Sequence, residues 1–268
     1  MIEASEASFA HEPDRVGYYL RHGLYDRLGV FESSSAVCEA MSLGEGPLII
    51  GVDGPSTGGK TSITDALVSH YQAKDIPVAV MPVDFFMTDR DVRARLTEEI
   101  KLGDLGPDEY SLQAWDHEKY NVHLHAARDI IARPAGSPTE TLIIPQAYSR
   151  LTGKQDQVQA IEVSPGGVVI AEGTGIHVFH DEAFDRTVRV DVRSTQTLLE
   201  RLKTREHLKP VENRLSDEYL IRRYGITDVP NTNFLRRASA GRADYVVDTT
   251  NVAELRLYKN NKIKRAHK

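Results

Sequence analysis

The chain contains a single cysteine, Cys38, among its 268 residues. One cysteine cannot form an internal disulfide and leaves no cysteine cluster for a zinc site, which is typical of a protein from a reducing compartment. The sequence also lacks an apolar run of membrane-spanning length, and its acidic opening lacks the apolar segment of a secretory signal. We therefore expect a cytoplasmic protein that has no membrane partner.

Positive charge is not in excess, because 33 Lys and Arg residues stand against 39 Asp and Glu residues, for a formal net charge of −6. A broad basic face for duplex nucleic acid is therefore not expected. With 40% hydrophobic residues, the chain is long enough to bury the core of one large α/β domain. These properties favour a small-molecule partner. The oligomeric state stays open, with a homo-oligomer among the alternatives.

Short apolar runs of strand length alternate with helical patterns along most of the chain. The apolar runs cover residues 48–52, 78–83, 141–144, 168–171, 188–192 and 245–247. The helical patterns cover residues 91–102, 112–132 and 195–207. This alternation predicts an α/β fold with three layers and a mostly parallel central sheet.

Both ends of the chain are interpreted as appendages to a domain that spans residues 47–250. Apolar residues between positions 18 and 30, including Leu28 and Val30, predict one or two helices and hence a helical extension over residues 1–46. Lys and Arg recur near the end, so residues 251–268 are interpreted as a solvated basic tail, with a binding arm as the alternative.

The most specific motif follows the first apolar run. Residues 54–61, GPSTGGKT, fit the pattern G-x-x-x-x-G-K-[ST], and a helical pattern comes next. In such a loop, backbone N–H groups surround phosphate oxygens, Lys60 supplies a cation for the β- and γ-phosphates, and Thr61 offers a hydroxyl to Mg²⁺. The motif predicts binding of ATP with Mg²⁺; the alternative is a Gly-rich turn without a ligand. The residues predicted to hold the nucleotide are Gly54, Pro55, Ser56, Thr57, Gly58, Gly59, Lys60, Thr61 and Ser62.

Two acids are predicted at strand ends beside this loop. Asp84 follows the run at 78–83, and Glu172 follows the run at 168–171. Because ligands of open α/β sheets bind at the carboxyl ends of the strands, both carboxylates are expected near the terminal phosphate. We predict that Asp84 receives the proton of an attacking hydroxyl and that Glu172 holds Mg²⁺, with Asp84 as a further metal ligand. The alternatives are an Asp84 that caps a turn and a Glu172 that is only an exposed acid.

In this order, the motifs resemble those of the P-loop kinase family that contains uridine kinase, phosphoribulokinase and bacterial pantothenate kinase. The matching segments are residues 54–62, Asp84-Phe85-Phe86, Trp115-Asp116-His117 with Tyr120, residues 145–148 and residues 169–173. The resemblance implies an ATP-dependent kinase that phosphorylates an alcohol, above all the primary hydroxyl of a nucleoside. Pantothenate, glycerate, sugar and sugar-phosphate kinases are the alternatives within enzymes, and a regulatory NTPase switch is the alternative from another class.

The resemblance also assigns an acceptor site. It implies that Asp84 is the general base and that Asp116 binds adjacent sugar hydroxyls, for which a carboxylate has two acceptor oxygens. The residues implied to contact the acceptor are Asp84, Phe86, Asp116, His117, Tyr148, Arg222 and Arg223. One of the last two arginines would clamp a phosphate or carboxylate of the acceptor. Glu118 and Ser149 depart from the proline and aspartate common in nucleoside kinases, which leaves the acceptor open.

The helical pattern at 195–207 resembles the lid of this family. The lid would bring Arg201 and Arg205 over the transferred phosphoryl group, where positive charge stabilises the equatorial oxygens. The alternative is a solvated basic helix whose arginines pair with neighbouring glutamates.

Overall fold

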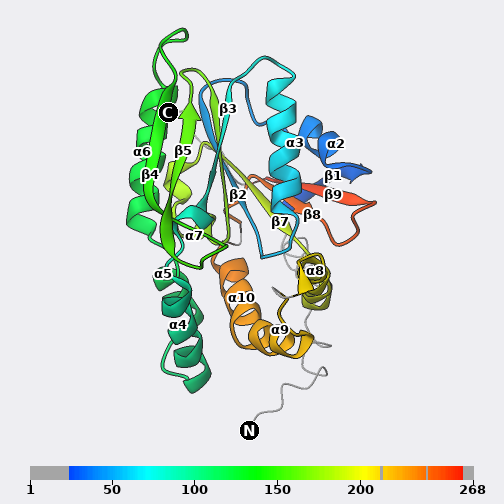
Figure 1. The fold of residues 1–268 in the computed structure, drawn as a ribbon. Helices are drawn as coiled ribbons and strands as arrows, with labels where there is room; N and C mark the ends of the chain where they lie inside the picture. The colour runs from blue at the N-terminus through cyan, green and yellow to red at the C-terminus, as the bar shows by residue number, and fades with distance from the viewer. Residues whose placement is uncertain (1–23, 212–213, 240, 262–268) are drawn as a thin grey trace.

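The structure, a computed structural model, describes residues 24–211, 214–239 and 241–261. Within these residues, seven strands form one sheet (Figure 1). In the order in which they pair, they are β1 (Tyr25–Phe31), β9 (Leu255–Asn260), β8 (Tyr245–Asp248), β7 (Arg186–Asp191), β2 (Leu48–Asp53), β6 (Val168–Gly173) and β3 (Val78–Pro82). The strands from β8 to β3 are parallel, whereas β9 runs antiparallel to both of its neighbours. The predicted α/β fold with a mostly parallel sheet is confirmed.

Helices cover both faces of this sheet (Figure 1). On one face lie α2 (Ser34–Ala40) and α3 (Lys60–Gln72). The other face is covered by α6 (His117–Ile131) and α7 (Ile176–Phe179), together with an antiparallel ribbon of β4 (Glu140–Tyr148) and β5 (Gln155–Val163). The sheet is therefore the middle of three layers.

A further group of helices lies at the end of the sheet where β2 leads into α3 (Figure 1). They are α4 (Arg90–Leu102), α5 (Pro107–Gln113), α8 (Thr195–His207), α9 (Asp217–Arg223) and α10 (Val229–Ala238). Short turns complete the chain: η2 (Val83–Phe86), η3 (Asp181–Ala183) and η5 (Tyr224–Asp228). Among the described residues, none of the helices combines the length and apolar character needed to cross a bilayer.

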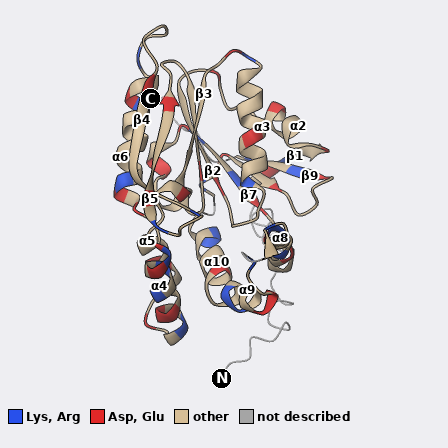
Figure 2. Ribbon diagram, in the orientation of Figure 1, with Lys and Arg blue, Asp and Glu red and all other residues tan. Residues whose placement is uncertain are grey.

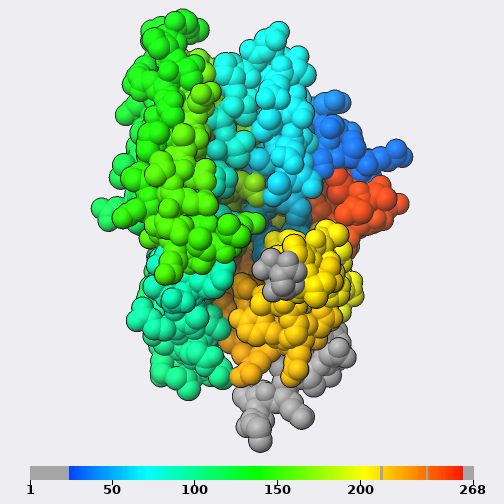
Figure 3. All heavy atoms as spheres, viewed as in Figure 1, coloured from blue at the N-terminus to red at the C-terminus, as the bar shows by residue number. Residues whose placement is uncertain are grey.

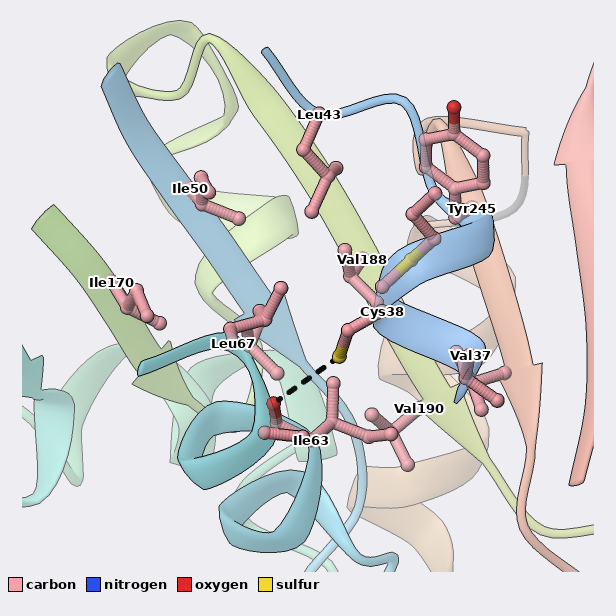
Figure 4. Close-up of a cluster of buried hydrophobic side chains, with 14 of the residues drawn as sticks. Val37, Cys38, Leu43, Ile50, Ile63, Leu67, Ile170, Val188, Val190 and Tyr245 are labelled. Carbon is pink, nitrogen blue, oxygen red and sulfur yellow. Dashed lines mark hydrogen bonds between the residues drawn. The ribbon is translucent and has the colours of Figure 1, made fainter. Parts of the chain in front are cut away.

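The core is divided by the sheet into two clusters. In β2, Ile50 belongs to the cluster below α2 and α3, whereas Ile49 belongs to the cluster below α6. Successive strand residues point to opposite faces of the sheet. A strand that is buried on both faces therefore has a continuous run of apolar residues in its sequence. Figure 4 shows the first cluster, in which Cys38 of α2 packs over α3 and its thiol lies 3.9 Å from the carbonyl oxygen of Ile63. Burial of each large apolar side chain contributes about 1.5–3 kcal/mol.

The helical prediction for the start of the chain is wrong for residues 25–31, whereas α2 (Ser34–Ala40) is a helix within the predicted extension. Leu28 and Val30 lie in β1, which pairs antiparallel with β9. Residues 18–23 of the predicted helices lie outside the described residues. The backbone hydrogen bonds of β1 come from a partner more than 200 positions away in the sequence, which local periodicity cannot indicate.

The interpretation of residues 251–268 as a tail is also corrected. Residues 255–260 form β9, which lies between β1 and β8 in the sheet, and Leu257 is fully buried. Residues 262–268 lie outside the described residues. The sheet therefore extends beyond both limits of the domain predicted at 47–250.

Two middle segments differ from the prediction. The run at 141–144 lies in β4, which belongs to the β4–β5 ribbon and not to the central sheet. The single helix predicted over 112–132 is two helices, α5 and α6, separated by residues 114–116. Trp115 in this break forms an isolated antiparallel bridge with Met87, and this tertiary contact interrupts the helix.

Candidate active site

The loop of residues 54–59 connects β2 to α3. Gly59, with a φ of 97°, precedes the first helical residue, Lys60, and only glycine adopts this left-handed conformation without strain. The loop also passes close to β7, since a Cβ atom on Gly54 would collide with the carbonyl oxygen of Val190. The strand, loop and helix arrangement that the motif requires is therefore present, with the free N–H groups of the α3 terminus at the loop.

Lys60 shares one electrostatic neighbourhood with the two predicted acids. Its Nζ donates hydrogen bonds to the carbonyl oxygens of Gly54 at 3.1 Å and Pro55 at 3.0 Å. Burial lowers the pKa of Lys60, and the charges of Glu172 and then Asp84 act in the opposite direction. Both strand-end carboxylates thus lie near the lysine of the phosphate motif.

Glu172 and Thr61 provide adjacent oxygen atoms. The Thr61 hydroxyl donates a hydrogen bond to Oε1 of Glu172 at 3.1 Å. Such hard oxygen ligands suit Mg²⁺, which is commonly held by one or two carboxylates together with phosphates and water. In the described part of the chain, no group of three or more His, Cys, Asp or Glu side chains forms a dedicated metal cage. The donor set fits a cation that arrives with a nucleotide.

Asp84 lies in η2, directly after β3, and forms an ion pair with Arg150. The pair joins Oδ2 of Asp84 to Nη2 of Arg150, which belongs to the turn between β4 and β5. Asp84 raises the pKa of Arg150. Arg150 is not among the predicted site residues, although it comes two positions after the segment 145–148 that carried the resemblance.

The Asp-Phe-Phe and Trp-Asp-His segments are joined in the structure. The backbone N–H of Asp116 donates to the carbonyl oxygen of Phe86 at 2.7 Å. The Asp116 side chain caps α6 by accepting a hydrogen bond from the N–H of Lys119 at 2.9 Å. Asp116 therefore lies beside the turn that carries Asp84, and one of its oxygen atoms stabilises the helix.

Two residues predicted to contact the acceptor, Phe86 and His117, have partners within the protein. The Phe86 side chain is fully buried and packs edge-on against Tyr120, with ring centroids 5.0 Å apart. His117 directs Nε2 to the carbonyl oxygen of Ser111 at 2.9 Å and Nδ1 to His180 at 2.9 Å. Removing an apolar ring from water stabilises the folded protein, which accounts for the buried position of Phe86. Both ring nitrogens of His117 have partners within the protein.

Tyr148 ends β4, two residues before Arg150, and presents little surface. Its exposed fraction is 7%, and the guanidinium carbon of Arg93 lies 4.7 Å from the ring centroid. Arg93 also donates a hydrogen bond to the Tyr148 hydroxyl. Sequence analysis did not predict that Arg93 of α4 would cover this ring, because the contact joins segments 55 positions apart.

The two predicted lid arginines of α8 face different surroundings. Arg201 donates hydrogen bonds to backbone carbonyl oxygens of Thr57, Thr249 and Thr250, so it lies against the phosphate loop. Arg205 is close enough to Arg150 for their like charges to interact. Of the two, only Arg205 interacts electrostatically with Arg150, the partner of Asp84.

Arg222 and Arg223 belong to the helical layer below the sheet. The charge of Asp228 raises the pKa of Arg223, and Arg222 interacts with Glu98 of α4. Figure 2 shows Lys and Arg in α8, α9 and α10 at this end of the molecule. No described contact links Arg222 to Asp84.

Asp53 is a further residue that the sequence analysis missed. Its side chain is 1% exposed, and Oδ1 accepts hydrogen bonds from the N–H groups of Gly54 at 2.8 Å and Gly175 at 2.7 Å. Oδ2 accepts from Arg189 at 2.9 Å. Asp53 therefore fixes the start of the phosphate loop to the segment after Glu172. The residue lies between the apolar run and the glycine motif, where the sequence gives no separate signal.

The chain has the α/β fold of P-loop kinases, in which the loop of residues 54–59 follows β2, Asp84 follows β3 and Glu172 lies near the carboxyl end of β6. Three solved structures share this fold. A "Possible Uridine Kinase" from Bacillus stearothermophilus has a TM-score of 0.53 and 18% identity, over 80% of this chain and 96% of that one. A D-glycerate 3-kinase from Cryptococcus neoformans has a TM-score of 0.52 and 16% identity, over 87% and 92%. A phosphoribulokinase from Rhodobacter spheroides has a TM-score of 0.50 and 14% identity, over 84% and 83%.

These neighbours are consistent with the family that the sequence resembles. No protein-family model and no curated protein sequence matches the chain. At identities of 14% to 18%, the likeness establishes the fold. The three similar proteins are also named for different substrates, so the acceptor has to be inferred from the residues of this chain.

Proposed function

We propose that this chain is an ATP- and Mg²⁺-dependent kinase that transfers the γ-phosphoryl group to the hydroxyl of a small alcohol. The main support is the position of Lys60: burial lowers its pKa, and the nearby charges of Glu172 and Asp84 oppose that shift. A hydrolytic NTPase needs the lysine and a metal-binding acid. A kinase also needs a group that receives the proton of the attacking alcohol, and Asp84 supplies one.

Each residue has a separate task in this reaction. Lys60 and the N–H groups of the loop bind the β- and γ-phosphates and stabilise the charge that spreads over the transferred group. Thr61 and Glu172 would hold Mg²⁺, which neutralises phosphate charge when bound. Asp84 accepts the hydroxyl proton as the alcohol oxygen bonds to phosphorus and the bond to ADP breaks. The products are ADP and a phosphate monoester.

The resemblance makes a nucleoside the first acceptor to test. Pantothenate, glycerate, sugars and sugar phosphates form the second group, supported by Arg150, which adds a positive charge beside Asp84. A regulatory NTPase is the remaining alternative. It would hydrolyse ATP slowly, make no phosphorylated small molecule and respond to a protein partner.

The substitution Asp84→Asn tests the assigned base. We expect kcat to fall by about 10²- to 10⁴-fold, because general base catalysis contributes that much, while the affinity for ATP stays unchanged. Phosphorylated acceptor is measured by mass spectrometry and ATP affinity by calorimetry. Asp91→Asn is the control, since Asp91 is an exposed residue on the nearby helix α4.

Two outcomes would contradict the proposal in different ways. An Asp84→Asn variant with normal turnover would show that Asp84 is not the base. ATP hydrolysis without a phosphorylated product from any alcohol would favour the NTPase alternative.

A further inference from the structure

Arg150 has N–H donors beside Asp84 that form no hydrogen bond with another described side chain. Among the described residues, its only side-chain partner is Asp84, which contacts one of its terminal nitrogens. The Arg150 side chain is 74% exposed. A guanidinium group carries five N–H donors in a planar fork, so one carboxylate oxygen leaves most of them unused.

Arg205 faces the same space from another element. In the part of the chain that the structure describes, its guanidinium group forms no hydrogen bond or ion pair. Its pKa is lowered first by burial and next by the positive charge of Arg150. Figure 3 shows the green surface of the β4–β5 ribbon facing the yellow surface of α8 and α9. The charges of Glu206 and Asp228 act on the pKa of Arg205 in the opposite direction. Two guanidinium groups that face one space suit a phosphate or a carboxylate.

The aromatic residues predicted for the acceptor offer no free ring face. Phe86 is fully buried, and Arg93 covers the ring of Tyr148, which is 7% exposed. A nucleoside base would gain stacking energy from an exposed aromatic face. Neither residue supplies one, whereas charged donors are available beside Asp84.

We propose that Arg150, with Arg205 opposite, binds an anionic group of the acceptor, which is then a hydroxy acid or a phosphorylated polyol and not an uncharged nucleoside. This inference rests on the proposed kinase activity. A carboxylate or phosphate held by Arg150 brings a hydroxyl of the same small molecule to Asp84. The ion pair between Arg150 and Asp84 thereby couples recognition of the anion to placement of the attacking oxygen.

Two other roles for Arg150 predict different kinetics. If Arg150 only orients Asp84, or if it contacts the transferred phosphoryl group, its loss lowers kcat for charged and uncharged acceptors alike. If it binds the acceptor anion, its loss raises KM for charged acceptors and leaves the KM for ATP unchanged.

Matched acceptors test the charge requirement with ATP and Mg²⁺. One series is glycerol, D-glycerate and glycerol 3-phosphate; a second is ribose and ribose 5-phosphate; uridine represents the uncharged nucleosides. We expect at least about a tenfold higher kcat/KM for the charged members, because charge-assisted hydrogen bonds are the strong ones. D-Glycerate against glycerol 3-phosphate distinguishes a carboxylate from a phosphate. A preference for uridine or for uncharged members would overturn the inference.

Variants of Arg150 test the residue itself. Arg150→Gln should raise KM for the preferred charged acceptor at least about tenfold, and Arg150→Lys should restore part of the loss because it keeps the charge without the fork. Arg133→Gln is the matched control, since Arg133 is an exposed arginine paired with Glu140 at the start of β4. Equal loss of kcat for every acceptor, with KM unchanged, would contradict the proposal.

A binding measurement separates this inference from the proposed function. The phosphate loop is first saturated with Mg²⁺ and a non-hydrolysable ATP analogue, and D-glycerate and glycerol 3-phosphate are then titrated by calorimetry. Binding that Arg150→Gln weakens at least tenfold supports the anion site even if no acceptor is phosphorylated, in which case only the kinase proposal fails. Absence of binding, or binding that the variant leaves unchanged, would reject the anion site.

Discussion

At the scale of single residues, the phosphate loop depends on a close approach between two backbones. Gly54 leaves β2 so near to β7 that the carbonyl oxygen of Val190 occupies the position where a Cβ atom would lie. Asp53 fixes the same point by accepting the N–H of Gly54 at 2.8 Å. The requirement for glycine here is steric and comes from a neighbouring strand.

The substitution Gly54→Ala should therefore both destabilise the protein and impair nucleotide binding. Overpacking of this kind costs about 1–3 kcal/mol, and moving the loop to relieve it displaces the N–H groups that would face phosphate. Melting temperature and ATP affinity are the measurements. Gly46→Ala is the control, because a Cβ atom on Gly46 has open space around it. Equal behaviour of the two variants would refute the steric explanation.

At the scale of elements, a histidine pair joins α6 to the segment after α7. Nε2 of His117 donates to the carbonyl oxygen of Ser111, so its Nδ1 accepts a hydrogen bond from Nε2 of His180 at 2.9 Å. Nδ1 of His180 lies 2.7 Å from Oδ1 of Asn121. Burial, followed by the neighbouring His117, lowers the pKa of His180 from 6.5 to about 3.

This pair makes the free energy of unfolding depend on pH. A lowered pKa favours the neutral ring in the folded protein, so the contribution of His180 is complete above pH 6.5 and is lost as the pH falls toward 3. The loss is up to about 1.4 kcal/mol per pH unit. Urea unfolding at a series of pH values measures it. His180→Gln should reduce the slope, and His125→Gln, an exposed histidine of α6, should not; identical slopes would contradict this assignment.

At the scale of the whole molecule, buried charges link the lower helical layer to the phosphate loop. Arg236 of α10 donates two hydrogen bonds to Oδ1 of Asp191 in β7, at 3.0 and 2.8 Å. Arg189 of the same strand pairs with Asp53 at 2.9 Å. All four side chains are buried. A buried charge that loses its partner destabilises the folded protein. These buried ion pairs therefore hold α10, β7 and β2 in one arrangement.

Arg236→Met should lower the free energy of unfolding by about 3–5 kcal/mol, because the buried Asp191 loses two charge-assisted hydrogen bonds and keeps the more distant Arg189, at 3.9 Å. The change is read from the urea midpoint, with an unchanged slope against urea showing that the folding transition is the same. Arg237→Met is the matched control, since Arg237 is the next residue of α10 and is exposed. A similar loss in both variants would mean that the buried pair contributes no more than a surface arginine.

Several elements could be predicted because their causes are local. Strands buried on both faces, such as β2 and β6, read as continuous apolar runs, and the phosphate motif needs glycine, lysine and threonine at fixed spacing. The failures share one cause, which is long-range contact. β1 and β9 pair across the length of the chain, and Trp115 divides a helix by bridging to Met87.

The sequence by itself determined the phosphate loop and the two strand-end acids, because the conformation of a loop and the end of a buried strand follow from neighbouring residues. Only the tertiary structure decided what surrounds Asp84. Arg150 comes from the turn between β4 and β5 and Arg205 from α8, and their charges interact only after the chain has folded. Electrostatic interaction depends on distance in space and not on position in sequence, so the character of the acceptor site is a property of the fold.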